Sequence, residues 1–572
     1  MAKPAGHLVF TLHTHLPFVL NHGRWPHGSD WLSEATVECY LPLLRMLDGL
    51  ARDDIPAAIT MNISPILCEQ LASSAFQEEM TAFFDQRLRS CEETRRHFTD
   101  TQEHNLVALC DYWRAVHEER RREFDAMGGD LLARFRRLAD RGTVELISTA
   151  ATHGYFPLLS RDESLELQLR TAIDAHTRHF GCRPRGVWLP ECAYRPRYQW
   201  TPPAGPRSGK VRYRRRGVEE LLAAHGLEYF FTDVHLVRGG QALSAYRDYF
   251  PRLRTVQGQE AEFRRREGRS PYLPYRVASR GGTGDAVALV RDPETTLQVW
   301  SRDAGYPGDE WYLEFHKRHF PGGLRFWRVT SPASDLGDKQ VYVPERAEAR
   351  TRAHAEHFIG LVRGVLERHA AGSGDNGVLC SPFDTELFGH WWHEGPVWLD
   401  HVLRGLAGAG VASVASSAYL AEQAAQGPIT LLEGSWGEGG DHRVWLNKDT
   451  AWTWETVYQA EDDLWNFVAR AAWRQQPLLR RIVAQLGREL LLLQASDWQF
   501  LITTWAARNY AEARFAQHYA DFTRLLELAK RVEGGGAVSS EDEELLVGKE
   551  TQDFCFPGIA EHLEAAAALP PA

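Results

Sequence analysis

The residues "HLVFTLHTHL", His7 to Leu16, begin the chain with an apolar run that ends in alternating histidines. This run predicts a buried β-strand, because short apolar stretches that end in polar residues are typical of strands in parallel sheets. The pattern returns in "VELISTAATHGYFP" (Val144 to Pro157), "GVWLPECAY" (Gly186 to Tyr194) and "NGVLCSPFDTELFG" (Asn376 to Gly389). Several strands of this kind predict one parallel sheet or barrel.

Helical patterns rich in Leu, Ala, Arg and Glu separate these strands, notably over Thr101 to Arg141, Ser164 to Phe180 and Ala347 to His369. The alternation of strands and helices predicts an α/β fold, in which polar residues that follow the strands line the active-site face. From about Leu420 onward the apolar residues recur at helical spacing. We therefore expect a separate helical C-terminal domain.

The composition is typical of a globular protein, with 44% hydrophobic and 25% charged residues among 572. A net charge of −11 gives no sign of a nucleic-acid partner. No apolar run reaches the roughly 18 residues that a membrane span needs, and histidines break the opening apolar stretch, unlike a signal peptide. The sequence thus predicts a cytoplasmic protein with no membrane partner.

The eight cysteines form no CxxC pair, so neither a zinc knuckle nor a disulfide framework is predicted. The nineteen tryptophans are a more informative feature. Flat aromatic faces pack well against the C–H faces of pyranose rings, while the sugar hydroxyls form hydrogen bonds at the rim. The alternative is that many of these indoles are large core residues.

His13 and His15 occupy positions i and i+2 of the first predicted strand, so both imidazoles point to the same side. That geometry suits either metal binding or hydrogen bonding to a polyol. His153 could be a further ligand, but no diagnostic ligand spacing accompanies the pair. The segment "HWWHE", His390 to Glu394, matches neither zinc-protease motif.

Two carboxylates follow predicted strands in aromatic surroundings: Glu191 in "GVWLPECAYRP" and Asp384 in "SPFDTELFGHWW". A pair of carboxylates is what glycosidic bond chemistry requires, since one attacks or stabilises the anomeric carbon while the other protonates the leaving oxygen. Their environments must differ, because burial near apolar rings raises a carboxyl pKa and hydrogen-bond donors lower it. Structural ion pairs are the alternative.

Five stretches in order, "HTHLPF", "VELISTAATHGYFP", "GVWLPECAYRP", "SPFDTELFGHWWHEGP" and "QASDWQFLI", resemble the five conserved regions of glycoside hydrolase family 57. Within that family the likeness is greater to the 1,4-α-glucan branching enzymes. The resemblance implies an incomplete (β/α)₇ barrel with a small inserted domain and a helical C-terminal domain. We place the barrel at residues 1–194 and 256–420, the inserted domain and active-site loop at 195–255, and the helical domain at 421–572.

The resemblance also implies the site residues. Glu191 is expected to be the nucleophile and Asp384 the general acid/base of a retaining mechanism, with their carboxyl groups roughly 5 to 5.5 Å apart. Further residues are expected to line the sugar site or to form its aromatic platforms: His13, His15, Glu145, His153 and Asp497, with Trp300, Trp391, Trp392, Trp436, Trp445 and Trp498. Glu386 and Glu394 are expected to have structural roles.

The acceptor that reaches the glycosyl-enzyme decides the product, so a covering loop must favour a sugar over water. Branching enzymes of the family that this sequence resembles have a mobile loop with a tyrosine near the site, and the resemblance implies that the stretch "DVHLVRGGQALSAYRDYFPRL", Asp233 to Leu253, is that loop, with Gly239 and Gly240 as a hinge. Tyr246 is the expected loop tyrosine and Tyr249 the second candidate. The predicted partner is an α-1,4-glucan acted on by a monomer without metal or other cofactor.

Other functions fit parts of the same pattern. An α-glucan hydrolase or a 4-α-glucanotransferase of the same family would use the same two carboxylates. A metal-dependent deacetylase or mannosidase-like enzyme would use His13 and His15 as ligands. A non-catalytic glucan-binding protein would use the aromatic platforms without the chemistry.

Overall fold

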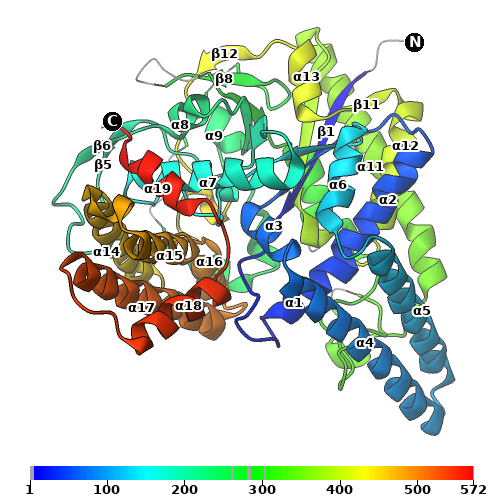
Figure 1. Cartoon of the computed structure of the whole chain (residues 1–572). Helices are drawn as coiled ribbons and strands as arrows, with labels where there is room; N and C mark the ends of the chain where they lie inside the picture. The colour runs from blue at the N-terminus through cyan, green and yellow to red at the C-terminus, as the bar shows by residue number, and fades with distance from the viewer. Residues whose placement is uncertain are drawn as a thin grey trace.

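A parallel sheet around strand β1 forms the centre of the protein (Figure 1). The computed structural model describes residues 5–258, 263–266, 268–279, 285–301, 304–331 and 333–570. Strand β1 (Gly6–Thr14) lies between β10 (Val378–Asp384) and β2 (Ile59–Ile63), and β2 pairs with β3 (Val144–Ile147). All these pairings are parallel, so the carboxyl ends of the strands lie at one edge.

A second sheet contributes three more parallel strands: β4 (Gly186–Val187), β7 (Tyr229–Thr232) and β9 (Val287–Val290). Single bridges, Ser148 with Val187 and Arg291 with Cys380, join this sheet to β3 and β10. Parallel strands therefore follow one another in a ring, in the order β1, β2, β3, β4, β7, β9 and β10. Three short strands flank it: β11 (Val411–Ser413) pairs with β1, β8 (Tyr275–Val277) pairs with β9, and β12 (Gln426–Ile429) pairs with the outer side of β8.

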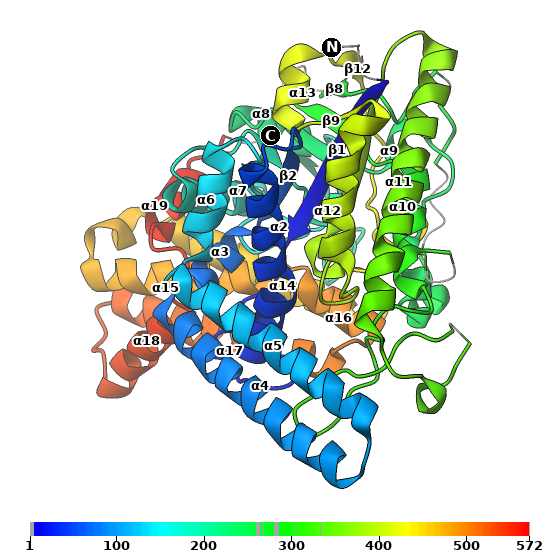
Figure 2. The same cartoon turned by 90° about the vertical axis from the view of Figure 1, so that its right-hand side faces the viewer.

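Helices surround the ring, and the predicted helical stretches are confirmed with different ends. The stretch from Thr101 to Arg141 is two helices, because Gly128 and Gly129 both have positive φ angles and Asp130 caps the second helix by accepting from the Ala133 N–H. Helices α4 and α5 form a projecting hairpin (Figure 2). The bounds are α1 (Ser29–Ala35), α2 (Leu41–Arg52), α3 (Pro65–Leu71), α4 (Ser74–Asp100), α5 (His104–Ala126), α6 (Leu131–Asp140), α7 (Asp162–Phe180), α8 (Val218–Ala224), α9 (Val234–Arg238), α10 (Pro293–Trp300), α11 (Pro344–Ser373), α12 (Gly395–Leu406) and α13 (Ser416–Glu422).

The C-terminal helices lie together beside the ring (Figure 1). They are α14 (Ala451–Val468), α15 (Pro477–Leu493), α16 (Asp497–Thr504), α17 (Arg508–Glu533), α18 (Ser540–Gln552) and α19 (Ile559–Ala567). The leucine-rich helix α15 packs against α14, α17, α18 and α19 and buries its apolar face among them. The loop after β1 also contacts this layer, where His22 Nε2 lies 2.6 Å from Asp553 Oδ1.

The domain bounds differ from the expected ones in two places. The expected inserted domain, 195–255, contains β7, whose buried "YFFT" pairs with β4 and β9 and so belongs to the ring. Within that range a separate antiparallel hairpin is formed by β5 (Tyr198–Trp200) and β6 (Tyr213–Arg215). The expected boundary at 421 precedes β12, and the helical layer begins at Ala451. Among the helices that the structure describes, each is too short or too polar to cross a bilayer.

Candidate active site

Glu191 lies in the strained turn Pro190–Cys192, a short distance along the chain from the end of strand β4 at Val187. Its φ angle is +60° and that of Cys192 is +48°, conformations that residues other than glycine rarely adopt. Such strain persists where the surrounding structure enforces it, and it gathers at functional sites. Trp436 holds this turn twice: its indole N–H donates to Glu191 Oε2 at 2.8 Å and its backbone N–H donates to the Glu191 carbonyl at 3.1 Å.

Asp384 is the last residue of β10, opposite His13 in the register of the neighbouring strand β1. The Tyr246 hydroxyl donates a hydrogen bond of 2.6 Å to Asp384 Oδ2. The Tyr246 ring also lies 5.6 Å from the Trp436 ring, between centroids, so neighbouring aromatic side chains contact the two carboxylates. The structure therefore brings Tyr246 to Asp384, whereas the ring of Tyr249 packs near Trp300, 5.8 Å away.

Three imidazoles stack beside the carboxylates. The centroid of the His153 ring lies 4.3 Å from that of His15 and 4.9 Å from that of His13. Burial lowers the pKa of His13 to about 3 and holds the pKa of His153 well below its usual value, so both rings are neutral at pH 7. His153 Nδ1 is 3.9 Å from Glu191 Oε1.

Hydrogen bonds from neighbouring strands fix the orientation of these rings. His13 Nδ1 lies 2.6 Å from Asn62 Oδ1, and His15 Nδ1 lies 2.8 Å from Ser64 Oγ. His15 Nε2 lies 3.0 Å from an oxygen of Asp497, the first residue of α16. Asn62 and Ser64 were not predicted to be site residues. They lie at the end of β2, and a position at a strand end is the feature by which His13 and Asp384 were predicted.

His15, His153 and Asp497 also bring one possible ligand atom each to within 4.8 Å of the others. His15 Nε2 is already paired with Asp497, and His153 Nδ1 lies 3.0 Å from Ser496 Oγ. His153 Nε2 is buried without a hydrogen-bond partner among the described residues. Two imidazoles and one carboxylate in this arrangement suit the hydroxyl groups of a sugar, and the same donor set could accept a cation.

The two carboxyl groups titrate as a pair. Burial raises the pKa of Glu191 to about 8, against the hydrogen bond from Trp436. Burial also raises the pKa of Asp384 to about 6, against the hydrogen bond from Tyr246 and the charge of Arg291. Because the groups interact, these are values for the pair. Between about pH 6 and pH 8 the pair therefore carries one proton and one negative charge.

Several predicted tryptophans gather near this pair. The Trp300 ring lies 5.0 Å from Tyr246 and 5.8 Å from Trp391. The Trp445 ring stacks on Tyr155 at 4.5 Å. A Cβ atom on Gly437 would lie only 2.7 Å from the Trp445 ring, so the turn after Trp436 requires glycine for this packing.

The structure does not bring three of the predicted residues to this cluster. Glu145 lies near the start of β3, below the strand end, where it accepts from the Ser417 backbone N–H. Trp392 is buried 5.2 Å from the Trp398 ring. Trp498 is buried in the helical layer and donates to the Leu492 carbonyl. Their motifs also contain residues of the cluster, but alternation along a strand turns Glu145 elsewhere and helical spacing turns Trp498 elsewhere.

Two buried groups close to the pair were not predicted to take part. Arg291 follows β9, forms an ion pair with Asp233 and lies 5.3 Å from the Trp436 ring. Glu386 accepts from the Tyr40 hydroxyl at 3.2 Å, and burial raises its pKa to about 8. Glu394 has the structural role expected of it, since it accepts from the Tyr342 hydroxyl at 2.7 Å.

Comparisons with known proteins show which proteins the whole chain resembles. Residues 9–325 match the family model for glycosyl hydrolase family 57, and residues 456–563 match the model for the C-terminal part of 1,4-alpha-glucan branching enzymes. The chain is 40% identical to a 1,4-alpha-glucan branching enzyme of Thermococcus kodakarensis over 93% of this chain and 75% of that protein.

Solved structures show the same likeness along the whole chain. The GH57-type branching enzyme from Pyrococcus horikoshii matches with a TM-score of 0.87 and 38% identity over 99% of this chain and 98% of that one. The alpha-amylase AmyC from Thermotoga maritima matches with a TM-score of 0.78 and 26% identity over 98% of this chain and 99% of that one.

Proposed function

Because this chain belongs to glycosyl hydrolase family 57, we propose that the cluster around Glu191 and Asp384 is the active site of a 1,4-α-glucan branching enzyme. The enzyme cleaves an α-1,4 bond and transfers the released chain to a sugar 6-hydroxyl, which makes an α-1,6 branch. The observation that carries the proposal is the hydrogen bond from Tyr246 to Asp384 beside the Trp436–Glu191 contact. A tyrosine in that position covers the pair and limits the access of water.

The proposed reaction is a double displacement. In the free protein the order of the two pKa values places the shared proton on Glu191, so the reacting form is the one in which that proton has moved to Asp384. From this form Glu191 attacks the anomeric carbon while Asp384 gives its proton to the leaving 4-oxygen, and a glycosyl ester forms on Glu191. Asp384, now ionised, takes the proton of an incoming 6-hydroxyl, and that oxygen displaces Glu191 from the anomeric carbon. Two inversions give retained α stereochemistry.

The hydrogen bond from Tyr246 favours one half of this reaction and opposes the other. It stabilises the ionised form of Asp384, which is the form needed when Asp384 acts as the base. It opposes the protonated form, which the first half requires. We therefore propose that the covering loop closes over the glycosyl ester, when exclusion of water matters most, and that the substrate takes the place of Tyr246 in the first half.

The ring of parallel strands supports the expected incomplete (β/α)₇ barrel, with the β5–β6 hairpin as its inserted domain. In this interpretation Glu191 and Asp384 lie at the C-terminal ends of barrel strands, the usual position of active sites in such folds.

Incubation with amylose tests the proposal. Proton NMR then counts α-1,6 linkages and new reducing ends in the same sample. We expect branches to exceed reducing ends by far. Reducing ends without branches would show an α-glucan hydrolase, and longer and shorter linear chains without either would show a 4-α-glucanotransferase.

Tyr246→Phe removes the hydroxyl and keeps the ring that packs against Trp300 and Trp436. We expect the ratio of branches to reducing ends to fall by about tenfold, because water gains access to the glycosyl ester and one hydrogen bond to a charged group is worth about 1.5 kcal/mol or more. Tyr249→Phe is the matched control. An equal loss of transfer and hydrolysis in Tyr246→Phe would contradict this role.

The pH dependence follows from the shared proton. We expect kcat/KM to rise through an apparent pKa of about 6, since below it both carboxyls are protonated and the nucleophile is absent. It should fall through about 8, since above it both are ionised and the acid is absent. In Tyr246→Phe the acidic limb of the plot of kcat/KM against pH should move to higher pH, because loss of the hydrogen bond raises the pKa of Asp384. If the acidic limb of the pH profile stayed at the same pH in Tyr246→Phe, the Tyr246 hydrogen bond would not control the pKa of Asp384.

A further inference from the structure

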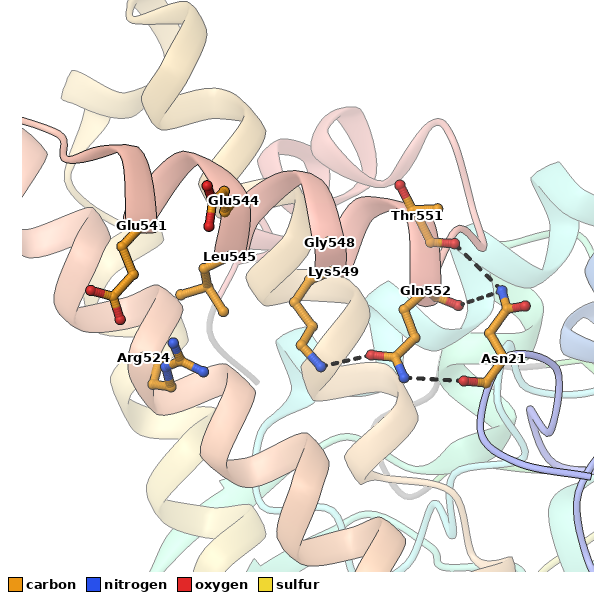
Figure 3. Close-up of a pocket in the computed structure, with 9 residues that line it drawn as sticks. All are labelled: Asn21, Arg524, Glu541, Glu544, Leu545, Gly548, Lys549, Thr551 and Gln552. Atoms are coloured by element: carbon orange, nitrogen blue, oxygen red, sulfur yellow. Dashed lines mark hydrogen bonds between the residues drawn. The ribbon is translucent and has the colours of Figure 1, made fainter.

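Two open hollows lie on the surface of the helical layer. The larger, about 710 Å³, lies between α17 and α18 and is lined mainly by polar and charged side chains such as Arg524, Glu541 and Glu544, with Leu545 as its large apolar side chain (Figure 3). The smaller, about 560 Å³, is lined by His27, Trp505, Ala507, Arg508, Asn509 and Tyr510. It combines aromatic rings with polar rim groups, which is the pattern that binds sugars.

Helix α16 leads from the active site to the smaller hollow. Its first residue, Asp497, contacts His15. One turn on, the Phe500 ring lies 6.3 Å from the Tyr246 ring. Trp505 follows the last residue of the helix, about 12 Å beyond Asp497 at 1.5 Å per residue. The smaller hollow therefore lies further from the two carboxylates than Phe500, along the direction in which helix α16 leaves the proposed glucan site.

Trp505 has an unusual conformation for so large a side chain. Its φ angle is +62°, in the left-handed region that favours glycine, and the residue is 57% exposed. A bulky residue there is a conformational outlier. Strain of this kind is informative when it places a side chain where packing does not need it.

Arg252 holds the indole of Trp505 in place. The guanidinium carbon lies 4.6 Å from the centre of the Trp505 ring, and Nη2 lies 3.2 Å from Asp449. Arg252 belongs to the short helix Pro251–Thr255, which follows the turn that carries Tyr246. The indole is thus fixed against the covering loop while most of its surface stays exposed to solvent.

We propose that the hollow around Trp505 is an outer subsite for an α-1,4-glucan chain. A pyranose ring packs on the exposed indole, and Asn509, Arg508 and His27 supply hydrogen bonds at the rim. The proposal rests on the proposed function for the identity of the ligand. It predicts that the subsite serves chains long enough to extend out of the active site.

Trp505→Gly is the variant that tests this subsite, because glycine adopts the positive φ angle without strain and the fold is kept. Affinity electrophoresis in gels that contain amylose measures binding without turnover. We expect the Kd for amylose to rise about fivefold to tenfold, which is the usual worth of one aromatic contact. The Kd for maltotriose, measured by calorimetry, should change less than twofold. Phe320→Ala, at a ring 64% exposed elsewhere, is the control and should leave amylose binding unchanged.

The outcomes separate this proposal from the proposed function. Unchanged amylose affinity in Trp505→Gly would overturn the subsite, even if the wild-type protein makes branches. Equal weakening for amylose and maltotriose would also overturn it, because Trp505 would then act through Arg252 on the active site. Loss of amylose affinity alone would support the subsite, even if the wild-type protein proved to be a hydrolase.

Discussion

Glu191→Gln should abolish turnover of amylose by a factor of about 10⁴ or more while the protein stays folded and still binds glucan. The loss is large because no glycosyl ester can form without the carboxylate, and a missing nucleophile removes a covalent step rather than one contact. The glutamine amide can still contact the Trp436 indole where Glu191 Oε2 accepts it. Rates are measured by release of reducing ends and by branch formation, and binding by affinity electrophoresis.

The same variant should be more stable than the wild type at high pH. Burial raises the folded-state pKa of Glu191 to about 8, so ionisation costs stability as the pH rises from the unfolded value near 4.5 to 8, and this loss is complete above 8. Glutamine does not ionise. We expect a higher Tm for Glu191→Gln at pH 9 and no difference at pH 4.

Glu461→Gln is the matched control, since burial also raises the pKa of Glu461, which accepts from the Ser160 backbone N–H. It should change the Tm without abolishing turnover. A second arm uses Glu191→Ala with an activated α-glucosyl fluoride and azide: azide entering from the side of the missing carboxylate should give the inverted β-azide. Near-normal turnover of Glu191→Gln would refute the assignment.

The sequence indicates much of the candidate site because many of its residues follow strand ends. His13, Glu191 and Asp384 each come directly after an apolar run, and parallel strands bring such residues to one edge whatever their distance along the chain. The order of strands and helices and the helical C-terminal layer could be predicted for the same reason, since both are periodic patterns.

Side-chain direction was harder to predict. Glu145 shares a motif with His153 but precedes the strand end, so its carboxylate meets Ser417. Trp498 is adjacent to Asp497, yet successive residues of a helix point about 100° apart and the indole packs inside the helical layer. Arg291 was missed because its role depends on a charge reaching across the ring to Asp384, which no local pattern shows.

The domain bounds were also difficult to predict, because the strands next to them are short. The four residues of β7 carry no alternation, and the Pro- and Gly-rich stretch before them marks the β5–β6 hairpin more strongly than the ring strand that follows. Pairing with β4 and β9 settles where β7 belongs, and pairing is a tertiary property.

Asp384→Asn should lower turnover of amylose by about 10³-fold or more, with a pattern that Glu191→Gln does not share. An acid is needed for a sugar leaving group but not for fluoride, so the first step with an α-glucosyl fluoride should remain fast and the glycosyl ester should accumulate. Mass spectrometry of the intact protein should then detect one sugar bound to the chain, and peptide mapping should place it on Glu191.

Azide gives the second distinction between the two carboxylates. In Asp384→Ala, azide needs no base, so it should attack the ester on Glu191 and restore turnover of the fluoride with retained α stereochemistry. Glu191→Ala should give the opposite anomer from the same reagents. If both variants gave the same anomer, or if the fluoride reacted as slowly as amylose in Asp384→Asn, the two roles would have to be reassigned. Opposite anomers would instead show that Asp384 moves the proton and Glu191 carries the sugar, and the hydrogen bond from Tyr246 would then act on the base of the transfer step.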